Sequence, residues 1–200
     1  MNFLGHAWLS PPHAEILVGN FTADFVGSKP PHHWTEACVE GWNLHRAIDA
    51  YTDRHPSFKI LKSELFPLVG HYAAVLADIW LDHILASAWT DLSQNQITLD
   101  VFCQQTYQNL HSVQSFFPLS FAGVFHRMHR ENWLQGYARP NGMRATLEGL
   151  SFRSPGFKPI LEKLQGPQPL VELLTLTQHP ARMAGIQLLQ DAQSHFQRTL

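Results

Sequence analysis

The chain has little charge and little cysteine for its length. Only 15% of its 200 residues are charged, and 14 Lys and Arg against 16 Asp and Glu leave a formal net charge of −2. That balance excludes the overall basic surface of a nucleic-acid-binding protein, so we expect no nucleic-acid partner. The two cysteines, Cys38 and Cys103, match no zinc-ribbon or redox spacing. Such sparse cysteine is typical of a protein with reduced thiols.

Long apolar runs are also missing. No stretch reaches the roughly 18 residues that a membrane span needs without meeting a charge. The first residues, MNFLGHAWLSPPH, lack the basic segment that opens a secretory signal. We therefore expect a cytoplasmic protein without a membrane span. The sequence leaves its oligomeric state open.

Apolar residues with helical spacing dominate the chain. Hydrophobic residues make up 44% of it, enough for a sizeable core, and convincing period-two alternation is absent. This pattern predicts an all-α fold in one compact helical domain over residues 1–200. Four helices are predicted at 35–51, 68–91, 98–111 and 120–137. Thr35, Thr98 and Ser120 are the expected N-caps of the first, third and fourth of these, and Pro56 closes the first. A further helix is predicted from Pro11 and Pro12 towards Phe25, and another after Pro167 or Pro169 with a kink at Pro180.

Two acidic residues lie in the most apolar of these helices. Residues 73–89, AAVLADIWLDHILASAW, are apolar on every side and contain Asp78, Asp82 and His83 but no Lys or Arg. A buried carboxylate must be paired, protonated or bound to a metal. Because Asp78 and Asp82 share one helical face, a cation between them is favoured. The alternative is that one of them caps a neighbouring helix or pairs with a distant Arg.

A second group of polar residues occurs in residues 41–56. His45 and Asp49 are four residues apart and adjacent on a helix, with Asp53 further along the same stripe. Imidazole and carboxylates are natural ligands of Mn²⁺, Fe²⁺ or Zn²⁺, and the guanidinium of Arg46 suits a phosphate. Taken alone, this group fits a surface helix with ion pairs at least as well.

A third group lies near the start of the chain. Asp24 is the one charged residue in the apolar stretch 16–27, and Asn20 precedes it by four residues. Asn20 is placed either to orient Asp24 or a substrate, or to cap a chain reversal. His6 is flanked by apolar residues, a setting in which a histidine is more often part of the core than a ligand.

Charge is distributed unevenly between the two parts of the chain. Residues 1–115 carry five Lys and Arg against eleven Asp and Glu, whereas residues 116–200 carry nine against five. The acidic part would suit a metal, and the basic segment 126–163 would suit an acidic partner. An ordinary solvated face explains the same counts equally well.

In combination, these residues resemble the acyl carrier protein phosphodiesterase family. The likeness covers roughly the first 90 residues, with Gly5 where the family has Ala. The matching residues are Met1-Asn2-Phe3-Leu4, His6, Gly19-Asn20, Ala23-Asp24-Phe25-Val26, Gly41, His45-Arg46-Ala47-Ile48-Asp49, Thr52-Asp53, Asp78, Asp82-His83, Leu85 and Trp89. The resemblance implies a distant relative of the HD-domain phosphohydrolases, although Asp82-His83 reverses the usual His-Asp order.

The resemblance also implies an activity. Family members remove the 4′-phosphopantetheine arm from holo-acyl carrier protein with a divalent metal, typically Mn²⁺, with Mg²⁺ or Fe²⁺ as alternatives. Acyl carrier proteins are acidic, so the holo form is the expected partner of the basic segment, including Arg127 and Arg130.

The residue roles form a hypothesis within that resemblance. The metal ligands are Asp24, His45, Asp78 and Asp82, with Asp49 as a further ligand or as a group that orients His45. Arg46 holds the phosphate, and His83 or His6 protonates the leaving serine oxygen. The residues assigned to substrate binding are Asn20, Asp53, Arg127 and Arg130.

Two other functions stay open from the sequence. One is a metal-dependent phosphohydrolase that acts on a small nucleotide or another phosphodiester. It would use the same metal ligands but would need no protein-docking surface. The other is a non-catalytic helical module that binds a carrier protein, which would need no metal.

Overall fold

Helices account for the regular structure of the protein. The computed structural model describes residues 1–94, 96–153, 155–164 and 180–197, and within these ranges it contains helices and no strand. The predicted all-α fold is thereby confirmed. The α-helices are α1 (Phe3–Trp8), α2 (Ala14–Thr22), α3 (Glu36–Arg54), α4 (Pro56–Val69), α5 (Ala73–Ser87), α6 (Trp89–Leu92), α7 (Leu99–Ser112), α8 (Leu119–Arg130), α9 (Trp133–Gly136), α10 (Pro140–Arg153), α11 (Lys158–Leu164) and α13 (Pro180–Gln197). The short 3₁₀ segments are η1 (Ala23–Phe25), η2 (Gly70–Tyr72), η3 (Gln114–Phe116) and η4 (Pro155–Phe157).

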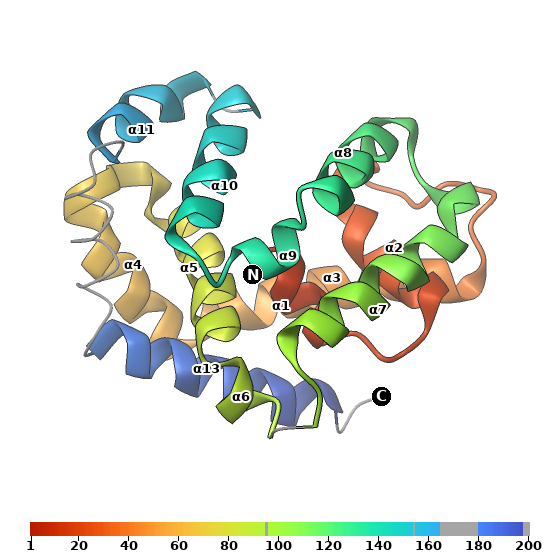
Figure 1. Ribbon diagram of the computed structural model, residues 1–200, viewed down its shortest axis with the longest axis horizontal. Helices are drawn as coiled ribbons and strands as arrows, with labels where there is room; N and C mark the ends of the chain where they lie inside the picture. Colours follow the sequence, from red (N-terminus) through yellow and green to blue (C-terminus); the bar gives the residue numbers. More distant parts are fainter. Residues whose placement is uncertain (95, 154, 165–179, 198–200) are drawn as a thin grey trace.

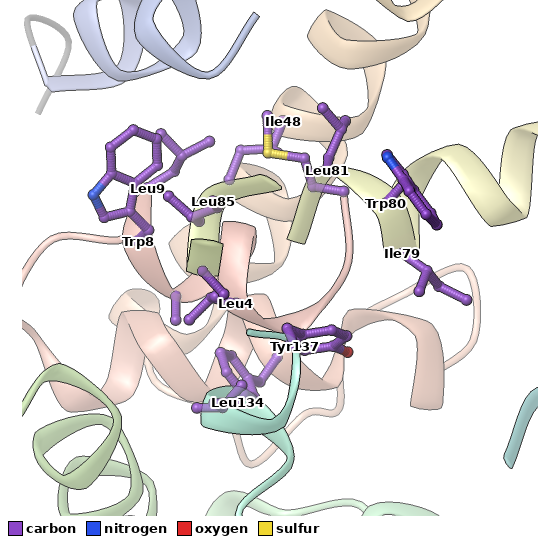
Figure 2. Close-up of a cluster of buried hydrophobic side chains, with 14 of the residues drawn as sticks. Leu4, Trp8, Leu9, Ile48, Ile79, Trp80, Leu81, Leu85, Leu134 and Tyr137 are labelled. Atoms are coloured by element: carbon purple, nitrogen blue, oxygen red, sulfur yellow. The ribbon is translucent and has the colours of Figure 1, made fainter. Parts of the chain in front are cut away.

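Helix α5 lies at the centre of the molecule. It packs against α1, α4 and α13, and α10 also contacts it (Figure 1). Apolar side chains of α1, α5 and the α9 region meet in one buried cluster, which includes Leu4, Leu85 and Leu134 (Figure 2). This position explains why α5 is so apolar, because the neighbouring helices bury most of its side chains, although Val75 stays 39% exposed.

The two helix N-caps predicted at threonines are confirmed. The hydroxyl of Thr35 accepts a hydrogen bond from the backbone N–H of Cys38 at the start of α3, and Thr98 accepts one from Val101 at the start of α7. Each hydroxyl satisfies a backbone donor that the first helical turn leaves without a partner.

The prediction of a single helix over 68–91 is wrong. Gly70 has a backbone φ of 56° and ends α4, so α5 begins only at Ala73. Pro56 follows α3 as expected, but it also opens α4, since its fixed φ suits the first turn of a helix. For this reason the sequence pattern predicts no separate helix at Pro56–Val69.

The predicted helix over 120–137 is two helices. Helix α8 starts at Leu119 rather than after Ser120, and it ends at Arg130. Asn132 has a left-handed φ of 47°, which separates α8 from α9. Pro180 is the first residue of α13 rather than a kink within the described helix. Pro167 and Pro169 lie outside the described residues.

One range is long and apolar enough to cross a membrane by length and composition alone. This range, Pro56–Ser87, contains α4, η2 and α5, and more than half of its most apolar window is buried inside the protein. Because the two helices pack on each other as core elements, the range is weak evidence for a membrane span.

Helices α2 and α3 approach each other very closely. A Cβ atom on Gly19 would overlap the carbonyl oxygen of Cys38, and a Cβ atom on Gly41 would overlap the carbonyl oxygen of Ile16. The two glycines therefore allow backbone-to-backbone contact where the helices cross. The crossing brings the end of α2 beside the middle of α3.

We expect Gly41→Ala to destabilise the protein. The added methyl group forces the crossing apart, and such overpacking costs about 1–3 kcal/mol of unfolding free energy. Chemical denaturation measures this loss. Gly27→Ala is the matched control, because a Cβ atom there meets nothing within 4 Å. Equal stability of the two variants would contradict the proposed close crossing.

Candidate functional site

Two histidines and two aspartates form a compact group at the α2–α3 crossing, here called the His–Asp cluster: His6 of α1, Asp24 of η1, and His45 and Asp49 of α3. The two imidazole rings stack with their centroids 4.2 Å apart. The Nε2 atoms of His6 and His45 each lie 3.2 Å from an oxygen of Asp49. The Nε2 atom of His45 also lies 3.3 Å from Asp24 Oδ1.

Asn20 fixes both imidazoles from the other side. Its side-chain Oδ1 lies 2.8 Å from Nδ1 of His6, and its backbone oxygen lies 2.9 Å from Nδ1 of His45. Both acceptors are carbonyl oxygens, so each Nδ1 atom donates its proton and each neutral ring keeps a lone pair on Nε2. The Asn20 amide nitrogen donates to the backbone oxygen of His6 and to the hydroxyl of Ser10, which fixes the orientation of the amide.

The pKa values of the two histidines are shifted in opposite directions. Burial lowers the pKa of His6 to about 4. Burial acts in the same direction on His45, but its ion pairs with Asp24 and Asp49 outweigh it and raise the pKa to about 9. Burial acts to raise the pKa of Asp49, yet the close contacts with the imidazoles of His45 and His6 dominate and lower it.

The His–Asp cluster fits a divalent metal ion. His6, His45 and Asp49 each offer a ligand atom, and these atoms lie within 4.8 Å of one another. The Nε2 atoms of both histidines are buried and make no well-formed hydrogen bond to any described residue. Once His45 has lost its Nε2 proton, two buried nitrogen lone pairs beside a carboxylate form the donor set that Mn²⁺, Fe²⁺ and Zn²⁺ accept. Asn20 would then be the outer partner that orients both imidazole ligands.

Asp78 lies beside the cluster but holds a different partner. The amino group of Met1 donates a hydrogen bond to Asp78 Oδ1 at 2.8 Å and lies 3.6 Å from Asp49 Oδ1. Burial raises the pKa of Asp78, and the charge of the amino group opposes that rise. Asp78 therefore joins the site through an ion pair with the start of the chain.

Asp82 holds the first helix in place. Its carboxylate accepts hydrogen bonds from the backbone N–H groups of Asn2, Leu4 and Gly5 at 3.2, 2.7 and 3.0 Å. Burial raises the pKa of Asp82 to about 7, against the opposing effects of the Met1 amino group and these donors. These contacts match the alternative considered from the sequence, in which one aspartate caps a neighbouring helix.

Three other candidates, all among the described residues, make no hydrogen bond or ion pair with a member of the cluster. Nδ1 of His83 lies 2.7 Å from the backbone oxygen of Tyr137, which directs the ring towards the α9 region. The exposed guanidinium of Arg46 stacks 3.3 Å from the ring centroid of Trp42. Asp53 is exposed near the end of α3, and its negative charge adds to the rise in the pKa of Asp78.

The two candidate docking arginines lie in the last turn of α8. Both side chains are more than half exposed, and both form ion pairs with Glu131. Arg127 also lies 5.7 Å from the ring centroid of Trp133. The pair therefore forms part of a basic helix end, which His129 extends.

A pocket of about 170 Å³ opens beside the cluster and is here called the cluster pocket. Its polar lining comes from residues already described, including Asp78 of α5. Its residues are Met1, Asn2, Phe3, His6, Asn20, Phe21, Asp24, Phe25, His45, Val75, Asp78, Ile79 and Leu150. No pattern in the sequence indicated that the Met1 amino group, or the side chains of Phe3, Phe21 and Phe25, would line a pocket. An apolar residue carries no local signal that distinguishes a pocket wall from a core position.

Fold and site together define an all-helical protein with a His–carboxylate group suited to a divalent cation. The model of the acyl carrier protein phosphodiesterase family matches residues 1–173, and the chain belongs to this family. A protein from Salmonella paratyphi A named acyl carrier protein phosphodiesterase is 30% identical over 155 residues, 78% of this chain and 80% of that one. A protein of the same name from Klebsiella pneumoniae subsp. pneumoniae is 27% identical over 165 residues, 82% of this chain and 85% of its own. No solved structure matches the chain, so the HD-like architecture stays a prediction.

We expect Asn20→Ala to weaken metal binding. Loss of the hydrogen bonds to His6 and His45 frees both rings, and loss of an outer partner typically costs about 10–100-fold in metal affinity. Calorimetric titration with Mn²⁺ measures the change. Thr22→Val is the matched control, because Thr22 is equally buried on α2 but donates only to the backbone oxygen of Val18. A folded Asn20→Ala protein with normal affinity would refute this role.

We expect Mn²⁺ binding at pH 7 to release about one proton. With a pKa of about 9, His45 carries a proton that must leave before Nε2 can act as a ligand, whereas His6, with a pKa of about 4, is already neutral. Apparent affinity should therefore rise about tenfold per pH unit between pH 6 and 8. Titrations in buffers of different ionisation enthalpy count the protons. Release of none, or of two, would contradict the assigned states.

Proposed function

We propose that the protein hydrolyses the phosphodiester between 4′-phosphopantetheine and the serine of holo-acyl carrier protein in the cytoplasm. The products are apo-acyl carrier protein and 4′-phosphopantetheine. The observation that carries the proposal is the His–Asp cluster at the wall of the cluster pocket, in a chain of the acyl carrier protein phosphodiesterase family.

His6, His45 and Asp49 would hold a divalent metal, Mn²⁺ in the first instance and Mg²⁺ or Fe²⁺ as alternatives. Asp24 would be a further ligand, since it faces Nε2 of His45 from η1. When bound, such an ion would lower the pKa of water and neutralise charge on the phosphoryl oxygens. Relative to the sequence hypothesis, His6 moves from proton donor to ligand, because its Nε2 atom faces Asp49 and its pKa is low.

The remaining polar groups of the pocket would position the substrate and supply a proton. Asn20 keeps the Nε2 atoms of both histidines directed at one point. Asp78 and the Met1 amino group form a proton-bearing pair that lines the pocket, and we assign the protonation of the departing serine oxygen to this pair. Asp82 acts by holding α1, and hence His6, in position.

The end of α8 would receive the acidic carrier protein. Arg127 and Arg130 are exposed there, and Arg127 lies close to the start of the chain because it shares a pocket lining with Asn2 and Phe3. Opposite charges on the two proteins would steer their encounter and would make the rate fall with rising salt. A phosphohydrolase of small diesters needs no such surface, and this feature favours the carrier-protein substrate.

The direct test is intact-mass analysis of holo-acyl carrier protein after incubation with the protein and Mn²⁺. We expect the mass of one phosphopantetheine arm to be lost, and a chelator to prevent the loss. Asp49→Asn removes a ligand and should lower kcat/KM by more than about 100-fold. Asp91→Asn, an exposed aspartate on α6, is the matched control and should keep full activity.

Three results would contradict the proposal. Hydrolysis of bis(p-nitrophenyl) phosphate with no change in the carrier protein would favour the small-diester enzyme. Binding of the carrier protein without any turnover would favour the non-catalytic module. Full activity of Asp49→Asn would remove the assignment of the His–Asp cluster.

A further inference from the structure

A second pocket of about 250 Å³ lies next to the cluster pocket and is here called the side pocket. Its lining comes from the start of the chain and from α8, α9 and α10, and Figure 1 shows α8 and α10 on opposite sides of α9. The lining residues are Asn2, Phe3, Gly123, Val124, Arg127, Trp133, Tyr137, Ala145, Thr146, Gly149 and Phe152.

The two pockets adjoin each other. Asn2 and Phe3 belong to both linings, so the two pockets lie on either side of these residues. Two consecutive residues of α10 line different pockets: Gly149 lines the side pocket, and Leu150 lines the cluster pocket. A long flexible group bonded to a phosphate in the cluster pocket would therefore have the side pocket beside it.

Two helical glycines leave the side pocket open. A Cβ atom added to Gly123 of α8 or to Gly149 of α10 would meet no atom within 4 Å. A glycine inside a helix costs about 0.5–1 kcal/mol relative to alanine, and here packing gives no reason for that cost. The missing side chains correspond to free space in the pocket wall.

The walls of the side pocket suit a chain that is apolar with a few amide groups. Val124, Trp133 and Phe152 supply apolar surface. Phe152 is 81% exposed although it lines the pocket, so its ring is available to a bound molecule. Asn2 and Thr146 supply polar groups that can pair with amides.

We propose that the side pocket binds the pantetheine arm of the substrate. This inference rests on the proposed function, which puts the scissile phosphate in the cluster pocket. The arm carries a gem-dimethyl group, two amides and a terminal thiol, which matches apolar walls with a few polar groups. The phosphate links the arm to the carrier serine, so an arm in the side pocket leaves the carrier protein outside, beside the arginines of α8.

The test fills the pocket at its glycines. Gly123→Leu and Gly149→Leu place a side chain in the free space, and leucine favours a helix more than glycine does. We expect kcat/KM for holo-acyl carrier protein to fall at least about tenfold, mainly through KM, while Mn²⁺ affinity stays normal. Ala122→Leu is the matched control, because Ala122 is exposed on α8 and does not line the pocket.

A binding measurement separates this inference from the proposed function. Pantetheine alone, titrated by calorimetry, should bind the unmodified protein and Ala122→Leu but not the two glycine variants. Phe152→Ser should weaken pantetheine binding as well. Because the Phe152 side chain is largely exposed, this substitution should leave the stability of the protein unchanged. Normal pantetheine binding and normal KM in both folded glycine variants would overturn the assignment of the side pocket. Unmodified protein that binds pantetheine but leaves holo-acyl carrier protein intact would instead overturn the proposed function.

Discussion

The site depends on the hydrogen bonds of one buried amide. Asn20 accepts from Nδ1 of His6 with its side chain and from Nδ1 of His45 with its backbone, so one residue sets the tautomer and direction of two rings. Those rings come from helices that the sequence separates widely, α1 and α3. A side chain with both an acceptor and a donor is required here, because the same amide donates to the backbone of α1.

Asn20 can do this only because α2 lies almost in contact with α3. Gly19 and Gly41 remove the side chains that would hold the two backbones apart, and each lies a few residues from a polar member of the site. Close packing and chemistry are therefore linked, since any widening of the crossing lengthens the bond between His45 and the backbone oxygen of Asn20. Rigid secondary structure of this kind holds ligands more accurately than loops do.

Local patterns in the sequence predicted the helical class and the caps at Thr35 and Thr98 because those signals lie within a few residues of each other. The same patterns identified Asp78 and Asp82 as charges in an apolar helix that need partners, and Asp82 is indeed fully buried. They did not reveal those partners, the Met1 amino group and the N–H groups of α1, which lie nearly 80 residues away in the sequence. Only the packing of α1 on α5 brings them together.

The cap that Asp82 provides has a consequence for how the protein folds. Helix α1 has six residues, too few to be stable alone, and three of the N–H groups at its start and just before it donate to a carboxylate of the central helix. Its stability therefore depends on docking against α5, through a contact of high sequence separation of the kind that forms slowly in folding. His6 enters the cluster with α1. The candidate site is therefore complete only when α1 is docked on α5, so any change that loosens this docking would also displace His6 from the cluster.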